Sequence, residues 1–381
     1  MNNGNVLITS LGGTPVLSKS LFEQITDMQN IEKAYNQALK GKNKYNTEAI
    51  KFSMNETYNL QQLRQILIDG TYEFDGYINF KVYEPKERII DAPHFKDKIV
   101  QLAVNNVIKQ VYQPSFIHDS YACIDDKGTH KAVDRVSYFM RKAGWEYGEN
   151  ASIIKLDVRK FFYSIDREAL KSRLPKKIKC ERTLSILYKI INSADMIDFI
   201  GLPLGNTLSQ IFANIMMDML DQYCKRVLSL NYYVRYADDV ICIAKDKDEA
   251  NRVLGLMVEF LNNEVKLDIN EHKTKIFPIE QGVNAYGFKI YKTHRLLRND
   301  SKKKIKRKAK KFRRLLVEEK ITVEKVEQIL NSWYGHAKHG DSYNFIKRLI
   351  ERNDYICMNG KEVLKVNVDI IEKERGLIAT S

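Results

Sequence analysis

The feature that most constrains this chain is the segment YYVRYADDVICIA at residues 232–244. Two short runs rich in Tyr, Val and Ile flank the acidic pair Asp238 and Asp239, which predicts a β-hairpin with carboxylates at its tip. Carboxylates crowded at one turn repel each other unless cations lie between them. Oxygen ligands on a rigid turn suit Mg²⁺, which takes one or two protein carboxylates plus substrate phosphates. The alternative is a solvated hairpin turn, so a metal site here requires a third carboxylate nearby.

A third carboxylate is available in the segment ASIIKLDVRKFFYSID at residues 151–166. Its first half predicts a short apolar strand that ends at Asp157, and its second half predicts a turn into a helix. Three carboxylates on adjacent strand ends can hold two Mg²⁺ ions about 4 Å apart, as nucleotidyl transfer requires. Taken alone, Asp157 fits equally well as a cap of the following turn. Its combination with Asp238 and Asp239 favours the catalytic interpretation.

These segments resemble the motifs of reverse transcriptases. The strand with Asp157 resembles their first palm motif, and YADD resembles their Tyr-x-Asp-Asp box. The likeness continues, in the order of that family, through GLPLGNTLSQIFANIMMDMLDQY (201–223), LDINEHKTKI (267–276) and GVNAYGFKI (282–290).

Within this family the likeness is closest to the enzymes of diversity-generating retroelements. It rests on SYACIDDKGTHKAV (120–133), LGNTLSQ (204–210) and SWYGHAKHGDSYN (332–344). The resemblance covers about residues 20 to 350.

The resemblance implies an α+β fold, a right-hand polymerase with fingers, a palm built on an antiparallel sheet, and a helical thumb. We expect a division into 1–20 (a flexible start), 21–150 (N-terminal helices and fingers), 151–292 (palm, with a helical finger insert near 167–200), 293–350 (thumb) and 351–381 (a C-terminal tail). Within 21–150, the periodicity of residues 21–42 predicts one amphipathic helix. Residues 77–92 predict two strands around a turn at Pro85, and residues 94–112 a further helix.

The resemblance also implies roles for residues of the active site. Asp157, Asp238 and Asp239 are predicted metal ligands, with Val158 beside them, and Lys273 is predicted to protonate the leaving group. Basic residues of the finger hairpin grip the incoming triphosphate in this family, a task suited to Lys86 and Arg88, although a solvated basic hairpin is the alternative.

Nucleotide selection is predicted to involve Phe162, Leu204 and Gln210. Phe162 stands where the family places an aromatic ring under the sugar, which implies a preference for deoxynucleotides; Phe161 is the alternative for that place, and ordinary core packing is the alternative role. Leu204 replaces the Gln of most reverse transcriptases, and Gln210 replaces their Pro. The diversity-generating enzymes share the departure at Leu204, which goes with error-prone copying, while apolar helix packing is the other interpretation.

The most basic stretch, residues 293–316, carries apolar residues at helical spacing and predicts a helix with one cationic face. By resemblance it is a thumb helix that follows the primer–template backbone. His336 and His339 lie three residues apart, and phosphate contact is favoured there over metal binding. The predicted nucleic-acid-binding residues are Gly205, Tyr286, Gly287, Lys303, Lys304, Arg307, Lys311 and His336.

The composition agrees with a nucleic-acid partner. A formal net charge of +14 favours an extended polyanion, although a ribosomal or membrane-surface protein would also fit. The five cysteines are scattered without a metal-binding spacing. The sequence shows neither a signal peptide nor an apolar run long enough for a membrane helix, so we expect a cytoplasmic protein without a membrane partner.

The predicted activity is RNA-directed DNA polymerisation with two Mg²⁺ ions, with dNTPs, a cDNA primer and a structured template RNA as partners. Three biological roles remain open. The first is a diversity-generating retroelement enzyme, which by resemblance would work with a small basic accessory protein. The second is a bacterial defence reverse transcriptase that copies a noncoding RNA, with a companion defence protein. The third is a non-catalytic RNA-binding protein, against which the intact acidic and basic motifs argue.

Overall fold

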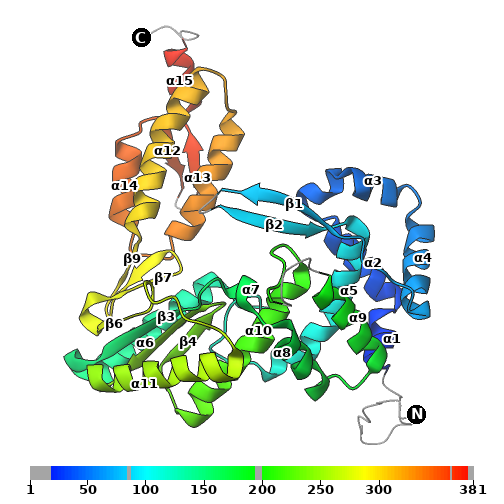
Figure 1. The fold of residues 1–381 in the computed structure, drawn as a ribbon. Coiled ribbons are helices and arrows are strands. Elements are labelled where there is room, and N and C mark those ends of the chain that lie inside the picture. Colours follow the sequence, from blue (N-terminus) through cyan, green and yellow to red (C-terminus); the bar gives the residue numbers. More distant parts are fainter. Residues whose placement is uncertain (1–18, 84–86, 194–199, 361–362, 376–381) are drawn as a thin grey trace, which may run out of the picture. The chain divides into compact units, whose positions relative to one another are not determined.

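The computed structural model describes residues 19–83, 87–193, 200–360 and 363–375, and its helices and strands are drawn in Figure 1. The chain divides into two compact units. Unit 1 comprises residues 1–126, 156–240 and 252–275, and unit 2 comprises 127–155, 241–251 and 276–381. Helices and β-sheets occur in both units, as the predicted α+β class requires.

Unit 1 begins with a group of short helices. The single helix predicted over 21–42 is wrong in detail, because the structure has α1 (Leu21–Ile25) and α2 (Met28–Ala38). Between them, the Asp27 side chain accepts a hydrogen bond from the backbone N–H of Gln29 and caps a new helix. Next come α3 (Thr47–Ser53) and α4 (Glu56–Asp69). Gly70 ends α4 in the left-handed region with φ 74°, a conformation that glycine adopts without a steric penalty.

The finger hairpin follows. Strands β1 (Tyr77–Val82) and β2 (Arg88–Pro93) pair antiparallel, with Tyr77 opposite Pro93 and Val82 opposite Arg88. Most of β1 is exposed to solvent, as expected of a two-stranded ribbon that packs little. Lys86, predicted to bind the triphosphate, lies outside the described residues. The predicted helix is α5 (Phe95–Tyr112), which packs against α2.

A four-stranded sheet carries the predicted palm strands in the order β4-β5-β3-β6. Its strands are β3 (Ser152–Asp157), β4 (Tyr233–Tyr236), β5 (Asp239–Ala244) and β6 (Lys275–Pro278). The apolar side chains of β3 are completely buried, because a central strand is covered on both faces. The predicted strand ending at Asp157 and the predicted hairpin at 232–244 are both present.

Helices α6 to α11 lie near these strands in the sequence. Those of unit 1 are α7 (Phe161–Ser164), α8 (Arg167–Arg173), α9 (Glu181–Asn192) and α10 (Thr207–Gln222). The side chain of Asn206 caps α10 by accepting a hydrogen bond from the N–H of Leu208. The others, α6 (Thr129–Glu146) and α11 (Lys247–Phe260), lie wholly or partly in unit 2.

Unit 2 contains the predicted thumb. After the antiparallel strands β7 (Val283–Ala285), β8 (Phe288–Ile290) and β9 (Arg295–Leu297) come three helices. They are α12 (Asn299–Val317), α13 (Val323–Ala337) and α14 (Tyr343–Glu351). The predicted basic helix is therefore present, but it starts at Asn299 because residues 295–297 pair with β8.

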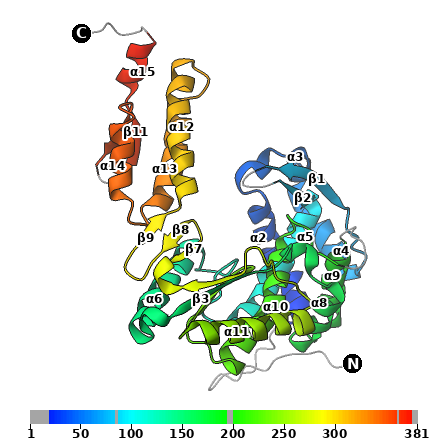
Figure 2. The same ribbon diagram turned by 60° about the vertical axis from the view of Figure 1, so that its left-hand side comes forward.

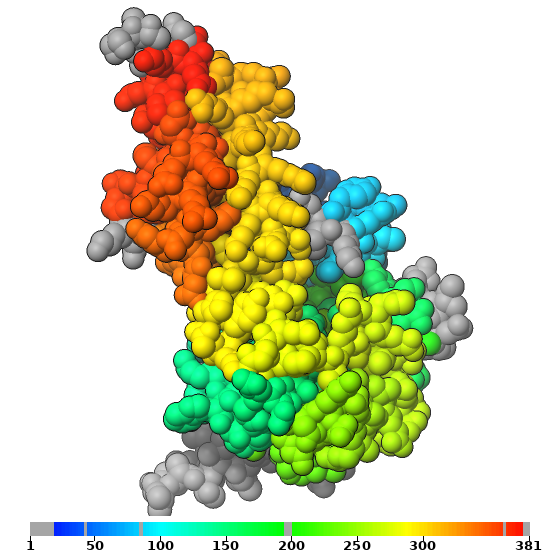
Figure 3. Space-filling model, turned by 90° about the vertical axis from the view of Figure 1, so that its left-hand side faces the viewer, coloured from blue at the N-terminus to red at the C-terminus, as the bar shows by residue number. Residues whose placement is uncertain are grey.

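The segment expected to be a C-terminal tail is folded. It forms β10 (Ile356–Asn359), β11 (Val363–Val366) and α15 (Val368–Glu374). Tyr355, Leu364 and Ile371 share one apolar core with Ile305 and Phe312 of α12. Figures 2 and 3 show these C-terminal elements, in orange and red, beside α12. In the described parts of the chain, no helix is both long enough and apolar enough to cross a membrane.

Candidate active site

The three predicted catalytic carboxylates lie on adjacent strands of one sheet, all within unit 1. Asp157 is the last residue of β3 and Asp239 is the first residue of β5, which is the neighbour of β3 in the sheet. Asp238 lies in the connection between β4 and β5, after Ala237, whose φ of 54° is in the left-handed region. Asp157 is 5% exposed, whereas Asp238 and Asp239 are half-buried. The hairpin therefore presents its acidic pair next to the end of β3.

The charges of these carboxylates interact. The pKa of Asp238 is raised to about 6, chiefly by burial and then by the nearby charges of Asp239 and Asp157, while Lys273 acts in the opposite direction. A carboxyl that titrates this high signals crowded negative charge in a partly desolvated site. Such a site attracts cations.

Lys273 supplies one cation. Its ammonium Nζ lies 2.8 Å from each carboxylate oxygen of Asp157. The hydrogen bond to Asp157 raises the pKa of Lys273, so the amine stays protonated. The loop that carries Lys273 is tied to β3, because the N–H of Asn270 donates to the Asp157 carbonyl at 2.7 Å and Val158 bridges to Ile269.

The donor set fits a hard divalent cation, but the side chains are not arranged as a closed cage. In the described residues, no group of three or more His, Cys, Asp or Glu side chains converges closely enough to hold a metal ion. Instead, Lys273 engages both oxygens of Asp157. Mg²⁺ in nucleotidyl transfer needs only one or two protein carboxylates plus substrate phosphates, so a complete protein cage is not required. Each Asp157 oxygen that accepts from Lys273 still has a further lone pair, so the lysine does not by itself exclude a metal ion.

Removing the charge of Asp238 is expected to stabilise the metal-free protein. The pKa of Asp238 is about 6 when folded, against about 3.9 in an unfolded chain, so its carboxylate opposes folding increasingly as the pH rises between these two values. Asp238→Asn should raise Tm by a few degrees at about pH 8 in EDTA, corresponding to about 1–3 kcal/mol at most. The difference should vanish below about pH 4. Thermal unfolding across this pH range tests it, and a lower Tm for the variant at high pH would contradict the assignment.

Leu204 and Gly205 are held against the finger strand β2. The N–H of Leu204 donates to the Asp91 carboxylate at 3.2 Å, and its carbonyl accepts from the Asp91 N–H at 2.5 Å. A Cβ at Gly205, where φ is 120°, would meet the Asp91 carbonyl oxygen at 2.7 Å. Gly205, a predicted nucleic-acid contact, is therefore the point where the backbone closely approaches the protein's own strand β2. Asp91 was not predicted, and no sequence motif points to it.

The aromatic pair after Asp157 divides into a core residue and a more accessible one. Phe161 is 4% exposed and belongs to the core, whereas Phe162 is half-buried. This difference favours Phe162 over Phe161 for contact with a nucleotide sugar.

Two further predicted nucleotide contacts are exposed to solvent. Arg88 is exposed at the start of β2, and Gln210 is exposed in the first turn of α10. Both side chains are accessible to a ligand.

Helix α12 in unit 2 has the two faces expected of a helix that binds a polyanion. Its apolar residues Ile305, Ala309, Phe312 and Leu316 are buried. The predicted nucleic-acid contacts are exposed to solvent: Lys303, Lys304, Arg307 and Lys311.

His336, a predicted phosphate contact, is half-buried in unit 2 and packs against the turn between β7 and β8. A Cβ on Gly287 would lie 2.6 Å from the Nε2 atom of His336, so the imidazole fills the space that a glycine leaves at the turn between β7 and β8. The ring also lies 4.5 Å from the Phe288 ring. Burial lowers the pKa of His336, and the nearby His130 and His339 lower it further. A neutral, packed imidazole is suited to shaping the turn with Tyr286 and Gly287.

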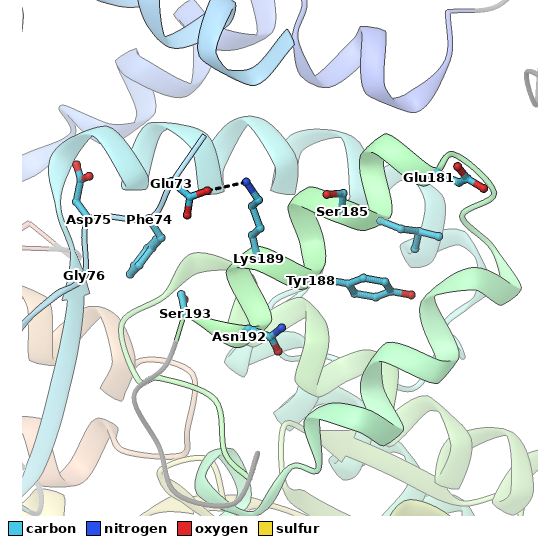
Figure 4. Close-up of a pocket in the computed structure, with 11 residues that line it drawn as sticks. Glu73, Phe74, Asp75, Gly76, Glu181, Ser185, Tyr188, Lys189, Asn192 and Ser193 are labelled. Atoms are coloured by element: carbon cyan, nitrogen blue, oxygen red, sulfur yellow. Dashed lines mark hydrogen bonds and ion pairs between the residues drawn. The ribbon is translucent and has the colours of Figure 1, made fainter. Parts of the chain in front are cut away.

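A cavity of about 790 Å³ in unit 1 contains none of the predicted site residues. It lies between α9 and residues 73–76, as Figure 4 shows. Lys189 at its wall donates hydrogen bonds to the carbonyl of Tyr72 and the carboxylate of Glu73. The charge of Lys189 is thus already paired with the carboxylate of Glu73.

Sequence reasoning missed a buried polar cluster behind the acidic turn. Arg235 and Asp221 are completely buried and form an ion pair, with Tyr233 and Asn214 bonded to it. The available signal was a charged residue in each of two apolar segments, Arg235 in YYVRY and Asp221 in the helix before it. Charged residues are rarely buried unless they are paired.

Comparison with known proteins identifies the family. The description "Reverse transcriptase (RNA-dependent DNA polymerase)" matches residues 81–325, which is most of the chain and includes all three carboxylates. The chain belongs to this family of RNA-directed DNA polymerases, and the predicted right-hand polymerase fold is confirmed. The diversity-generating type is not distinguished by this match.

Two curated relatives are similar over much of the chain. Protein YkfC of Escherichia coli K12 is 26% identical over 64% of this chain and 72% of its own length. The group II intron-encoded protein LtrA of Lactococcus lactis subsp. cremoris is 23% identical over 74% of this chain, and the match spans 59% of LtrA. Among solved structures, the apo telomerase of Candida tropicalis matches 73% of this chain and 60% of its own, with 14% identity and a TM-score of 0.48.

Proposed function

We propose that this protein adds deoxynucleotides to the 3′-hydroxyl of a primer on an RNA template and releases pyrophosphate. The observation that carries the proposal is the position of Asp157, Asp238 and Asp239 at neighbouring strand ends, with the pKa of Asp238 raised by burial and by its acidic neighbours. This arrangement lies within the part of the chain that matches the reverse transcriptase family.

The side chains at this site would have two roles, metal binding and proton donation. Asp157, Asp238 and Asp239, with the backbone at Val158, would hold two Mg²⁺ ions. When bound, such ions activate the attacking hydroxyl and stabilise the charge on the leaving oxygens. Lys273 stays protonated beside Asp157 and can deliver a proton to the leaving pyrophosphate once it releases the carboxylate.

Other residues would select and hold the nucleotide. Arg88 and Lys86 supply the cationic groups for the triphosphate, since guanidinium and ammonium groups bind phosphate oxygens well. Phe162 would lie under the sugar and exclude a 2′-hydroxyl, while Leu204 and Gln210 would face the nascent pair. The basic face of α12 supplies a surface for the RNA–DNA hybrid.

Primer extension tests the proposal directly. The purified chain is given a DNA primer annealed to an RNA template, dNTPs and Mg²⁺, and the products are resolved by length. We expect extension with dNTPs, none in EDTA, and much less with ribonucleotides. A folded protein that binds the hybrid and never extends it would instead support the non-catalytic RNA-binding role.

For the biological role, we propose an error-prone enzyme of a diversity-generating retroelement that copies a structured element RNA. The support is the presence of Leu204 and the motifs at 120–133 and 332–344. A small basic accessory protein is the expected partner. The alternative is a defence reverse transcriptase with a companion defence protein, which the YADD sequence and the C-terminal residues 358–381 keep open. Neighbouring genes separate the two, since template and variable repeats belong to the first and a toxin or second polymerase to the second.

Leu204→Gln is expected to lower misincorporation about tenfold. An amide at this position can hydrogen-bond beside the nascent pair, and about 1.4 kcal/mol of added discrimination corresponds to a tenfold lower error frequency. The effect should be greatest opposite template adenine. Sequencing of cDNA made from one defined RNA measures it, with Leu204→Met as the apolar control. An unchanged error spectrum, or a wild-type enzyme that is already accurate, would count against the diversity-generating role.

A further inference from the structure

Behind the acidic turn, one arginine is buried completely in a strand. Arg235 belongs to β4 and precedes Asp238 by three residues, and its side chain has no exposed surface. Burying a guanidinium is strongly unfavourable unless its donors are paired. The hydrogen-bond partners of the Arg235 guanidinium therefore indicate its structural role.

Two nitrogens of Arg235 are committed to one carboxylate. Nε donates to Asp221 Oδ1 at 2.8 Å, and Nη2 donates to Asp221 Oδ2 at 2.7 Å. Asp221 is itself completely buried in α10 and also accepts from the Tyr233 hydroxyl at 2.7 Å. A two-point contact of this kind fixes the plane of the guanidinium, which a single hydrogen bond would not do.

The remaining nitrogen reaches the acidic turn. Nη1 of Arg235 donates to Asn214 Oδ1 at 3.0 Å and to the carbonyl oxygen of Ala237 at 3.0 Å. That carbonyl belongs to the peptide group that joins Ala237 to Asp238. Because Ala237 has φ 54°, a conformation unfavourable for residues with a Cβ, the turn needs an external contact to hold it. Arg235 provides that contact.

The backbone of Arg235 is fixed as well. Its N–H donates to the Asp119 carbonyl at 2.9 Å, and its carbonyl accepts from the Tyr121 N–H at 3.0 Å. Asn214 links the same loop to α10, because its amide donates to the Ala122 carbonyl at 2.9 Å. The guanidinium is therefore anchored to α10 through Asp221 and Asn214, while the backbone of Arg235 is held by the segment 119–121, so the side chain cannot shift without breaking several bonds.

We propose that Arg235 is a positioning residue for the metal-binding carboxylates: through the Ala237 carbonyl it sets the orientation of the peptide that carries Asp238. It touches neither substrate nor metal. The proposal rests on the proposed function, since it assumes that Asp238 binds a divalent cation. The alternative is that the Arg235–Asp221 pair only stabilises the fold.

Arg235→Lys separates the two roles, because an ammonium keeps the charge opposite Asp221 but cannot bind that carboxylate at two points and also hold Ala237. We expect the Mn²⁺ concentration that half-saturates thermal stabilisation of the protein to rise about tenfold, and kcat of primer extension to fall about 10- to 100-fold, the range typical when a residue supporting metal ligands is lost. Affinity for the RNA–DNA hybrid in EDTA should stay unchanged.

Tyr233→Phe is the matched control. It removes one hydrogen bond from the same buried carboxylate but leaves every bond of Arg235 intact. It should lower Tm without altering the Mn²⁺ half-saturation or kcat. If both variants lose stability and neither changes its metal requirement, Arg235 is only a structural residue and the proposal is overturned.

A second variant covers the case in which Arg235→Lys does not fold. Replacing the pair and its hydroxyl partner with apolar residues, as Arg235→Met, Asp221→Leu and Tyr233→Phe together, removes the bond to Ala237 without leaving a buried charge unpaired. The same rise in metal requirement is expected, and a wild-type requirement in this folded variant would overturn the proposal.

The two readouts also separate this inference from the proposed function. If the wild-type protein binds Mn²⁺ but extends no primer, the proposed function fails and the metal titration alone decides the role of Arg235. If the wild type extends primers and Arg235→Lys matches it in both readouts, only the inference fails. A wild-type protein that Mn²⁺ does not stabilise and that extends no primer overturns both.

Discussion

Changing Asp238 and Asp239 together to Asn is expected to reduce primer extension on an RNA template by at least about a thousandfold. Metal ions at such sites supply several kcal/mol of transition-state stabilisation, and each decrement of about 1.36 kcal/mol is a factor of ten in rate. The double variant removes two of the three carboxylates while keeping the size of each side chain. Because both residues lie at a half-buried turn, the fold should be retained.

The loss must come from the chemistry and not from folding or hybrid binding. Circular dichroism, and titration of an RNA–DNA hybrid in EDTA, should therefore give wild-type results for the double variant. Asp248→Asn, at an exposed acidic residue in the first turn of α11, is the matched control and should leave extension unchanged. Wild-type extension by the double variant would eliminate the proposed site.

The parts of the site that sequence could predict are those specified locally. The YADD hairpin, the strand ending at Asp157 and the start of α10 at Asn206 each depend on residues within a few positions of one another. Alternating or continuous apolar runs and capping side chains act over this range, so they can be read without tertiary information. For the same reason, the cationic face of α12 could be predicted from its spacing alone.

The parts that were missed depend on contacts distant in the chain. The β10–β11 hairpin and α15 pack on α12, and short strands of this kind carry too little pattern to be distinguished from a tail. Lys273 was expected at the leaving group, but its bond to Asp157 spans 116 residues. In the sequence, Arg235 is one more residue of a predicted strand. Its ion pair with Asp221 becomes visible only when the packing of α10 behind β4 is known.

The break between α1 and α2 is a different kind of miss. The apolar periodicity of residues 21–42 runs through it without interruption, but Asp27 offers its carboxylate to the N–H of Gln29 and starts a second helix. Local side-chain hydrogen bonds thus overrode a periodic pattern. The same competition between a cap and a continuing helix limits how finely any helix boundary can be predicted.

Removing four exposed positive charges of α12 is expected to weaken hybrid binding strongly at low salt. The four predicted nucleic-acid contacts are among the exposed cations of this helix: Lys303, Lys304, Arg307 and Lys311. Changing all four to Ala should flatten the salt dependence of binding by about three units of log–log slope, since each phosphate contact contributes roughly 0.7–0.9. If both proteins bind alike near about 1 M salt, where the ionic contribution is small, affinity at about 0.1 M salt should fall about a thousandfold.

The apolar face of α12 stays intact in this variant, including its contacts with Tyr355 and Leu364. The Tm of the protein should therefore be unchanged. The control exchanges Lys and Arg at the same four positions, which preserves charge and should preserve the slope. Sequence preference should barely change, because phosphate contacts carry no base information. Titrations of an RNA–DNA hybrid at several salt concentrations measure the slope, and an unchanged slope in the Ala variant would show that this face of α12 is only solvated.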